Sequence, residues 1–396
     1  MENKCILIGV SGGIAAYKIN QLVSSLAKKG NDVHVLMTKE AEQFVTPLTF
    51  QTLSKNRVIT DIFSLDEQPE VHHIALASKA DAFVIAPATA NIIAKIANGI
   101  ADDMLTATFL AATCPKLVVP AMNTHMLENP ATQDNIEKCR RYGMHILDSA
   151  EGYLACGDIG KGRMPEADVI EDALSAVIET DRYLEGKNVL ISAGPTSEAI
   201  DPVRYITNHS SGKMGYSLAR AARNRGAKVT LVSGKTNLDT PVGVTRINIT
   251  SAAEMAEAVL SLSDEMDMII MAAAVADYTP QTVAENKIKK KEGEFVIPLK
   301  RTTDILASLG REKKDGQLLI GFAMETEDLI ANAEEKLVKK NADFIIANSI
   351  NEKGAGFAVD TNSVTIISKD GQNRLGLLSK DDTAEEILRF CAKGRV

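Results

Sequence analysis

The chain has 396 residues, of which 45% are hydrophobic and 24% are charged, and its formal net charge is -8. This length is too great for one ordinary core, so the composition predicts a soluble globular protein of two domains. The acidic balance argues against broad nucleic-acid binding, and no apolar stretch reaches the ~20 residues of a membrane span.

The five cysteines are scattered and form no CxxC pair. This pattern predicts neither a disulfide framework nor a zinc site, and it is typical of a protein from a reducing cytoplasm. The N-terminal residues lead directly into a predicted strand, without a basic segment or a small-residue cleavage site. No signal peptide is therefore expected.

The first strand–turn–helix–strand pattern covers Cys5–Thr38. An apolar strand ends at Ser11-Gly12-Gly13, a helix ends at Gly30, and the next strand is Val33–Met37. This order brings backbone N–H groups and a helix N-terminus beside a bound anion. The turn is not GxGxxG, and Met37-Thr38 stands where an acidic ribose ligand would follow the strand. The pattern therefore favours a mononucleotide over a dinucleotide, and a tight turn without a ligand is the alternative.

Two later strands of the first half also end in polar loops. Ala82–Ala86 is followed by Pro87–Asn91, and Lys116–Pro120 is followed by Ala121-Met122-Asn123. Strands that alternate with helices in this way predict a parallel sheet with helices on both faces. Ligands of such sheets bind beyond the carboxyl ends of the strands, so we expect the loops to form one cofactor crevice.

His73 and Asn123 are candidates for chemistry in the first half. His73 belongs to the pair His72-His73 ahead of the strand Ala82–Ala86, where a histidine at a strand edge is more often structural. Asn123 follows a strand, and capping the next helix is an equally good explanation for it.

Cys156 lies in the glycine-rich, charged segment Ala155–Pro165. The composition predicts a mobile surface loop of the kind that closes over an active site. Lys161 and Arg163 nearby favour the thiolate form, which would suit a nucleophile or acid. A passive thiol is the alternative.

The second half begins with the same strand–turn–helix–strand pattern, over Asn188–Gly234. A strand at Val189–Ser192 breaks at Ala193-Gly194-Pro195, a second glycine break at Ser211–Gly215 opens a helix, and a strand follows at Val229–Val232. Two such starts, far apart in the chain, predict two nucleotide-handling domains.

Met268–Ala276 is predicted to be a buried strand that ends at Asp277, and the basic run Lys287–Lys291 follows. An acidic strand end near lysines is where a polyphosphate and its magnesium ion would bind. A solvated face is the alternative for the basic run. The chain has no GxxxxGK[ST], so the half is expected to hold a Rossmann-like nucleoside triphosphate site without a P-loop.

A series of motifs in this order resembles one family along nearly the whole chain: the bifunctional phosphopantothenoylcysteine decarboxylase/phosphopantothenate–cysteine ligases of coenzyme A biosynthesis. The motifs are GVSGGIAAYK (Gly9–Lys18), His73-Ile74, APATAN (Ala86–Asn91), PAMN (Pro120–Asn123), ACGDIGKGRM (Ala155–Met164), AGPT (Ala193–Thr196), DPVRYITNHSSGKMG (Asp201–Gly215), AAVADY (Ala273–Tyr278) and KIKK (Lys287–Lys290).

The resemblance implies an α/β fold class with two Rossmann-like domains. Residues 1–182 would form a flavodoxin-like, FMN-binding decarboxylase domain of the HFCD flavoprotein type, and residues 188–396 a Rossmann-like, CTP-dependent ligase domain. It also implies a cytoplasmic homo-oligomer, in which trimers assemble into a dodecamer. The implied partners are 4′-phosphopantothenate, L-cysteine and CTP, with no nucleic acid and no membrane.

In the first half, the resemblance implies that the flavin oxidises the cysteine moiety of the substrate to a thioaldehyde, which then loses carbon dioxide to give an enethiol. His73 matches the catalytic histidine, Asn123 the residue that holds the substrate carboxylate, and Cys156 the cysteine that protonates the enethiol. The positions that match the FMN contacts are Ser11, Gly12, Thr38, Ala88 and Thr89.

In the second half, the resemblance implies that CTP and magnesium activate the 4′-phosphopantothenate carboxylate as an acyl-cytidylate, which the amine of cysteine attacks. Asn208 matches the residue needed for this intermediate, and Lys287 matches the lysine of a KxKK motif that neutralises charge. The metal ligands are not identified. The positions that match CTP contacts are Ala272, Ala273, Asp277, Lys287, Thr303, Asp304, Ile305, Leu306, Phe322, Lys336 and Lys340.

Two positions depart from the family pattern: Leu127 stands where an aromatic residue is common, and Ala75 stands where an acidic residue is frequent. Either change would alter packing around the flavin or substrate without removing a catalytic group. Two other functions stay open. A pyridine-nucleotide oxidoreductase lacks support, because GxGxxG with its acidic partner and a Tyr-x-x-x-Lys pair are absent. A flavin-binding regulator would have lost the catalytic histidine, asparagine or cysteine, and all are present here.

Overall fold

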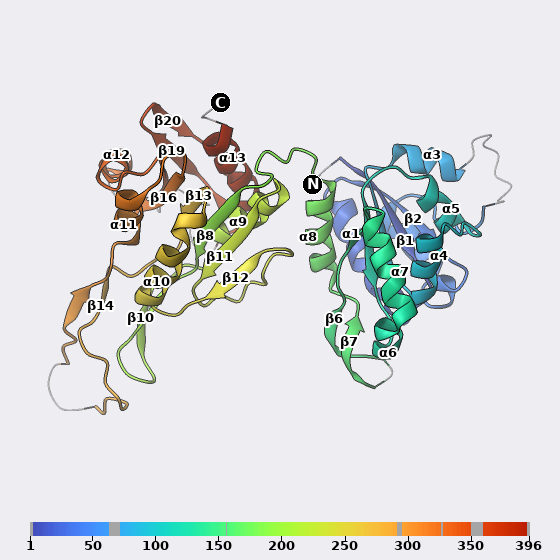
Figure 1. Ribbon diagram of the computed structural model, residues 1–396, viewed down its shortest axis with the longest axis horizontal. Helices are drawn as coiled ribbons and strands as arrows, with labels where there is room; N and C mark the ends of the chain where they lie inside the picture. The colour runs from blue at the N-terminus through green and yellow to red at the C-terminus, as the bar shows by residue number, and fades with distance from the viewer. Residues whose placement is uncertain are drawn as a thin grey trace. The chain divides into compact units, whose positions relative to one another are not determined.

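The protein divides into two compact units, Met1–Glu179 (unit 1) and Thr180–Val396 (unit 2), shown in Figure 1. The computed structural model describes residues 3–62, 72–155, 157–290, 295–325, 328–349 and 359–393. Each unit has a mainly or wholly parallel sheet with helices on its faces, which confirms the predicted α/β class with two Rossmann-like domains. Within the described ranges, no helix is long and apolar enough to span a membrane.

Unit 1 has a five-stranded sheet in the order β2-β1-β3-β4-β5. All the pairings are parallel, and the order is that of flavodoxin-like folds. Strand order reverses between β1 and β3, which makes this point the topological switch. The strands are β1 (Cys5–Val10), β2 (Asp32–Met37), β3 (Ala82–Ala88), β4 (Lys116–Pro120) and β5 (His145–Ile146).

Every residue of β1 and β3 is buried, because helices cover both faces of the sheet. Helices α3, α4, α5 and α7 share one apolar core with alternate residues of the strands, such as Leu7 and Phe83. Helices α1 and α8 contact each other away from that core. The helices of the unit are η1 (Ile14–Lys18), α1 (Ile19–Lys28), η2 (Ala41–Gln43), α2 (Pro47–Ser54), α3 (His72–Lys79), α4 (Ala90–Asn98), α5 (Met104–Ala111), α6 (Thr124–Glu128), α7 (Pro130–Arg141) and α8 (Ala167–Ile178).

Two segments of unit 1 differ from the sequence predictions. His72 and His73 begin helix α3 instead of lying at a strand edge. The segment Ala155–Pro165, predicted to be a mobile surface loop, contains β7 (Ile159–Arg163), which forms an antiparallel hairpin with β6 (Ala150–Tyr153). Its glycines allow close packing: the Met122 N–H donates to the Gly162 carbonyl over 3.0 Å. A Cβ at Gly162 would lie 2.1 Å from the Met122 carbonyl oxygen.

Unit 2 has an eight-stranded sheet in the order β12-β11-β8-β13-β16-β17-β19-β20. The strands from β12 to β17 are parallel and follow the Rossmann order, with the switch point between β8 and β13. The last two strands are antiparallel. The strands are β8 (Asn188–Ala193), β11 (Lys228–Ser233), β12 (Thr245–Asn248), β13 (Met268–Met271), β16 (Leu318–Glu325), β17 (Phe344–Ser349), β19 (Val364–Ser368) and β20 (Gly371–Arg374).

The helices of unit 2 pack in two groups. Helices α9 (Lys213–Asn224) and α13 (Lys380–Lys393) share one apolar core with the sheet, and α10 (Ala252–Leu262), α11 (Ile305–Glu312) and α12 (Leu329–Lys339) share another. A short 3-10 helix, η3, covers Ser263–Glu265. The short strand pairs are β9 (Ser197–Ala199) with β10 (Tyr205–Thr207), β14 (Tyr278–Pro280) with β15 (Leu299–Arg301), and β18 (Thr361–Asn362) with β21 (Leu378–Ser379).

The predicted strand Met268–Ala276 is too long, because β13 ends at Met271. Beyond this residue the chain follows the loop after β8 instead of the sheet. The Ala273 N–H donates to the Ser192 hydroxyl over 3.2 Å, and the Ala274 N–H donates to the Gly194 carbonyl over 2.9 Å. This departure from the sheet exposes the residues after Met271 to a pocket.

Helix α9 lies so close to β8 that only glycine fits at Gly215. A Cβ built there would lie 2.5 Å from the Ala193 Cβ and 3.1 Å from the Ser192 carbonyl oxygen. We therefore expect Gly215→Ala to lower the free energy of unfolding by about 1–3 kcal/mol, because the helix must move away from the strand. Urea unfolding of the full chain, followed by circular dichroism, measures the effect.

Gly376→Ala is the matched control, since a Cβ at Gly376 would meet nothing within 4 Å. Equal unfolding curves for both variants would show that the contact between α9 and β8 adapts without cost.

Candidate functional site

In unit 1, Ser11 joins the loops that follow β1 and β3. Its side chain is buried, with 2% exposure. The hydroxyl donates to the Pro87 carbonyl over 2.7 Å and accepts from the Thr89 N–H over 3.1 Å. Thr89 in turn is the N-cap of α4, where its Oγ1 accepts from the Ile92 N–H. A buried hydroxyl thus fixes a helix N-terminus at the switch point of the sheet.

The other predicted flavin residues lie along the same edge. The Thr38 N–H donates to the Val10 carbonyl over 3.1 Å, so the loop after β2 adjoins the end of β1. Gly12 packs against this loop, because a Cβ on it would lie 2.3 Å from the Glu40 Cβ. Ala88 is fully buried at the end of β3. Hydroxyls and backbone N–H groups beside a helix N-terminus suit a phosphate, so this edge fits a phosphate-bearing flavin.

Asn123 combines both roles that its position suggests. Its Oδ1 accepts from the His125 N–H over 2.9 Å and so caps α6, as the structural alternative predicts. Its Nδ2 donates to Asp158 Oδ2, at the tip of the β6–β7 hairpin, over 3.4 Å. The Thr124 hydroxyl also donates to the Lys161 carbonyl of the hairpin over 2.7 Å. The asparagine is therefore held beneath the hairpin tip.

The other two candidates of unit 1 are His73 and Cys156. His73 is half-buried in the first turn of α3. Cys156 lies outside the described residues, so its role stays a prediction. Leu127, the departure from the family pattern, lines a pocket of ≈ 450 Å³ together with Arg140 and Lys161. Its neighbours in this pocket come from the end of β4, from α6 and α7, from β5 and the loop after it, and from the hairpin.

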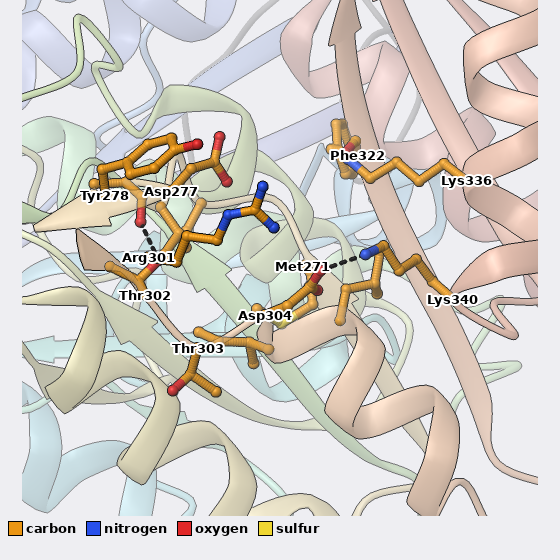
Figure 2. A pocket seen from close by; sticks show the side chains of 15 residues that line it. Met271, Asp277, Tyr278, Arg301, Thr302, Thr303, Asp304, Phe322, Lys336 and Lys340 are labelled. Carbon is orange, nitrogen blue, oxygen red and sulfur yellow. Dashed lines mark hydrogen bonds and ion pairs between the residues drawn. The ribbon is translucent and has the colours of Figure 1, made fainter. Parts of the chain in front are cut away.

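Unit 2 has a pocket of ≈ 620 Å³, lined by the loop after β13 and by α11, β16 and α12 (Figure 2). Lys336 and Lys340 enter it from one wall, and Asp277, Tyr278 and Arg301 from the opposite wall. Of the predicted CTP contacts, those that line this first pocket are Ala273, Asp277, Thr303, Asp304, Ile305, Leu306, Phe322, Lys336 and Lys340.

The charges of the first pocket are held in place by hydrogen bonds. The Lys340 ammonium forms an ion pair with Asp304, and the Lys336 ammonium donates to the Phe322 carbonyl over 2.9 Å. Burial alone would raise the pKa of Asp304, but the hydrogen bonds from Lys340 and the Ala307 N–H outweigh it and lower the pKa. Asp304 is therefore a carboxylate at neutral pH, and it orients Lys340 across the pocket.

Arg301 and Tyr278 also line the first pocket, and the sequence pattern does not indicate either. The two residues are paired across the β14–β15 ribbon. The Thr302 hydroxyl fixes the ribbon to the loop after β13 by donating to the Ala276 carbonyl over 2.6 Å. The signal for Arg301 was its position directly before Thr302-Thr303, and the signal for Tyr278 was its place at the end of the AAVADY motif.

A second pocket of ≈ 410 Å³ adjoins the first, and the two share a wall of residues. Both are lined by Ala273, Val275, Asp277, Phe322 and Lys336. Of the remaining predicted residues, Asn208 and Ala272 line the second pocket alone.

The N-terminus of α9 lines the second pocket with the residues Ser210–Gly215. Its N-cap, Gly212, has φ +80 and offers no side chain to the N–H groups of the first turn, which have no partner within a helix. Asn348 lines the same pocket with 7% exposure, and within the described ranges its Oδ1 has no hydrogen-bond partner. The first-turn N–H groups suit an anion with several oxygen atoms, and the Asn348 Oδ1 can accept a hydrogen bond from a donor on the same ligand.

Lys287 is exposed and lines neither pocket. Its neighbour Ile288 is anchored to a buried aspartate: the Ile288 N–H donates to Asp201 Oδ2 over 3.1 Å. The Ile288 carbonyl accepts from Arg204 over 2.9 Å. The segment that carries Lys287 is thus tied to Asp201 and Arg204.

A group of three potential metal ligands occurs in the described part of the chain: Cys5, Asp32 and His34. It lies at the amino ends of β1 and β2, at the opposite edge of the sheet from Ser11. The Lys79 ammonium lies 2.7 Å from Asp32 and 3.2 Å from His34 Nε2. This ammonium already supplies a cation to the group, so the cluster gives no support for the magnesium site.

Asp201 makes the anchor of Ile288 sensitive to acid. The hydrogen bond from Arg204 is the largest cause that lowers its pKa, burial opposes this, and the N–H groups of Val203, Ile288 and Arg204 add to the lowering. Its contribution to stability is therefore fully present above its unfolded-state pKa, roughly 4, and is lost as the pH falls through its lower folded-state pKa.

We expect Asp201→Asn to lower the unfolding temperature at pH 7. The difference in unfolding temperature between the variant and the wild type should become smaller as the pH approaches 3. Thermal unfolding of both proteins between pH 3 and pH 7 measures this difference. Asp264→Asn is the control, because the Asp264 side chain is 75% exposed and pairs with Lys314 at the surface. A constant difference across this pH range would contradict the role of the Asp201 carboxylate.

Two family models match the chain: Flavoprotein over residues 1–179, and the DNA/pantothenate metabolism flavoprotein C-terminal domain over residues 184–394. The chain is similar to the coenzyme A biosynthesis bifunctional protein CoaBC of Bacillus subtilis, with 51% identity over 99% of this chain and 97% of the relative. The protein of the same name from Vibrio parahaemolyticus is 46% identical, over 98% of each chain.

Among solved structures, the crystal structure of the C-terminal domain of a coenzyme A biosynthesis bifunctional protein CoaBC has 47% identity and a TM-score of 0.46. The match covers 54% of this chain and 98% of that one.

Proposed function

The chain belongs to the family of bifunctional coenzyme A biosynthesis proteins, and from this premise we propose how its two units divide the work. The protein is a decarboxylase joined to a ligase. Unit 2 joins 4′-phosphopantothenate to L-cysteine at the expense of CTP, and unit 1 decarboxylates the resulting 4′-phosphopantothenoylcysteine to 4′-phosphopantetheine. The observation that carries the ligase assignment is the pair of pockets that share Ala273, Val275 and Asp277.

In the ligase, CTP occupies the first pocket and 4′-phosphopantothenate approaches from the second. A carboxylate oxygen of 4′-phosphopantothenate attacks the α-phosphorus of CTP, and pyrophosphate leaves. The amine nitrogen of cysteine then attacks the carbonyl carbon of the acyl-cytidylate, and CMP leaves with the bonding electron pair. Activation is required because a carboxylate is a poor electrophile.

The charged residues of the pockets have separate roles in this scheme. Arg301, Lys336 and Lys340 would neutralise the phosphates, and Asp277 would offer a carboxylate to the magnesium ion that accompanies them. Asn208 hydrogen-bonds the acyl-cytidylate from the second pocket. Lys287 reaches the attacked carbonyl from the anchored segment and stabilises the charge that develops on its oxygen.

In the decarboxylase, FMN binds along the edge formed by Ser11, Gly12, Thr38, Ala88 and Thr89. When bound, the flavin supplies a reversible two-electron oxidation of the cysteine moiety. Three residues of this chain serve the substrate: His73 removes a proton, Asn123 holds the carboxylate that is lost as carbon dioxide, and Cys156 returns a proton to the enethiol. The β6–β7 hairpin, held against Asn123, excludes water.

We also infer a cytoplasmic homo-oligomer built from trimers that assemble into a dodecamer. In unit 1, large apolar side chains are exposed at Tyr17, Phe44 and Leu48, which supports contacts between subunits.

The first experiment is to mix the purified protein with 4′-phosphopantothenate, L-cysteine, CTP and Mg²⁺ and to record its visible spectrum. We expect a yellow protein that releases pyrophosphate and carbon dioxide in equal amounts and forms 4′-phosphopantetheine. A yellow protein that releases neither product would be a flavin-binding regulator instead. A protein that stays colourless after FMN is added would overturn the assignment of unit 1.

Two substitutions separate the reactions and serve as controls for each other. Cys156→Ser keeps FMN and full ligase activity but blocks completion of decarboxylation, because the acid for the enethiol is lost. Lys287→Gln lowers the ligase rate by roughly 100-fold or more and leaves decarboxylation unchanged, since it removes one stabilising charge. Pyrophosphate release measures ligation, and the formation of 4′-phosphopantetheine from supplied 4′-phosphopantothenoylcysteine measures decarboxylation. Wild-type product formation by Cys156→Ser, or a wild-type ligase rate for Lys287→Gln, would remove that residue from the mechanism.

A further inference from the structure

Lys380 is a buried lysine in the wall of the second pocket of unit 2. Its exposure is 6%, and it begins helix α13. Its ammonium donates to the Val359 carbonyl over 2.5 Å, and its backbone N–H donates to the Asp360 carbonyl over 2.9 Å. The side chain is therefore held in one position beside the pocket before any ligand binds.

Lys380 lies in a positive environment. Burial is the largest cause that lowers its pKa, the charge of Lys213 lowers it further, and Asp360 opposes both. Asp360 forms an ion pair with Lys213 over 2.6 Å, and its side chain is 87% exposed. Lys336 and Asp277 are the other charged side chains of this wall in the described part of the chain. An anion in the pocket would therefore meet more cationic than anionic groups.

Three elements bring hydrogen-bonding groups to this pocket. The first turn of α9 offers the N–H groups that follow Gly212, the end of β17 offers the buried amide of Asn348, and the start of α13 offers Lys380. The backbone N–H groups and the ammonium are donors that bind phosphoryl oxygens, while the Asn348 Oδ1 is an acceptor for a hydroxyl or N–H group of the same ligand. The nucleotide-sized first pocket adjoins this arrangement through Asp277 and Phe322.

We propose that Lys380 is a substrate-binding residue of the ligase, whose ammonium contacts a phosphoryl group in the second pocket. This inference rests on the proposed function, because the phosphoryl group belongs to a ligase substrate. It comes either from the β- and γ-phosphates of the nucleotide or from the 4′-phosphate of 4′-phosphopantothenate. In both cases the position fixed by Val359 allows contact without a further rearrangement of the side chain.

The test compares Lys380→Met, which removes the charge at similar length, with Lys380→Arg, which keeps it. Ligation kinetics at varied CTP and varied 4′-phosphopantothenate give KM and kcat for each. We expect Lys380→Met to raise the KM of the phosphate-bearing substrate that it contacts by roughly 10- to 100-fold, and Lys380→Arg to recover part of the loss.

Further ligands identify which phosphate is bound. A KM increase confined to CTP, with unchanged affinity for CMP, assigns Lys380 to the β- and γ-phosphates. A KM increase confined to 4′-phosphopantothenate assigns Lys380 to the 4′-phosphate, provided that the variant ligates unphosphorylated pantothenate as well as the wild type does. Either result supports the proposal.

Lys313→Met is the matched control, because Lys313 is a little-exposed lysine that pairs with Asp343 over 3.1 Å and lines neither pocket. Thermal unfolding shows that each variant is folded, and Lys380→Gln replaces Lys380→Met if the latter is not. Unchanged KM values for both substrates in a folded neutral variant would overturn the role of Lys380, as would an equal kinetic effect in Lys313→Met. A wild-type protein that ligates nothing would instead reject the proposed function itself.

Discussion

In both units a buried serine hydroxyl spans the point at which the strand order reverses. Ser11 follows β1 and bonds the loop after β3, while Ser192 near the end of β8 accepts from the Ala273 N–H beyond β13. At a switch point the two neighbouring loops leave in opposite directions and expose backbone groups that no strand can pair. A short side chain with one donor and two acceptor sites satisfies some of these groups and keeps the rest available to a ligand. Both candidate sites are built around this solution.

Close backbone approach is the second common feature. The turn after Ser11, the hairpin residue Gly162 and the helix start at Gly215 each lie where a methyl group would overlap a neighbour. These contacts set the distance between a helix or hairpin and the strand ends, and so fix the depth of each site. The glycine content of the motifs thus reflects packing as much as turn geometry. For this reason the β6–β7 segment looks mobile in sequence but is an ordered hairpin in its described residues.

The alternation of strands and helices was predictable because buried parallel strands are apolar on both faces and stand out from polar loops. The end of β13 was not, since Met268–Ala276 is uniformly apolar and only the hydrogen bonds to Ser192 and Gly194 show where the sheet stops. His73 was misplaced because the first turn of a helix carries too few residues for a periodic signal. Arg301 reaches the first pocket because its strand, β15, pairs with β14, which comes earlier in the chain. No local sequence pattern predicts such a contact.

The attachment of Ile288 to Asp201 and Arg204 has a consequence for the free energy of substrate binding. A long connection such as that between β14 and β15 normally loses conformational entropy when it orders around a substrate, and this loss weakens binding. Here the buried carboxylate of Asp201 and the partly exposed Arg204 fix one point of the connection, beside Lys287, the lysine that we propose contacts the substrate. A single peptide bond separates this fixed point from Lys287, so the fold and not the substrate limits the region in which the Lys287 ammonium can move.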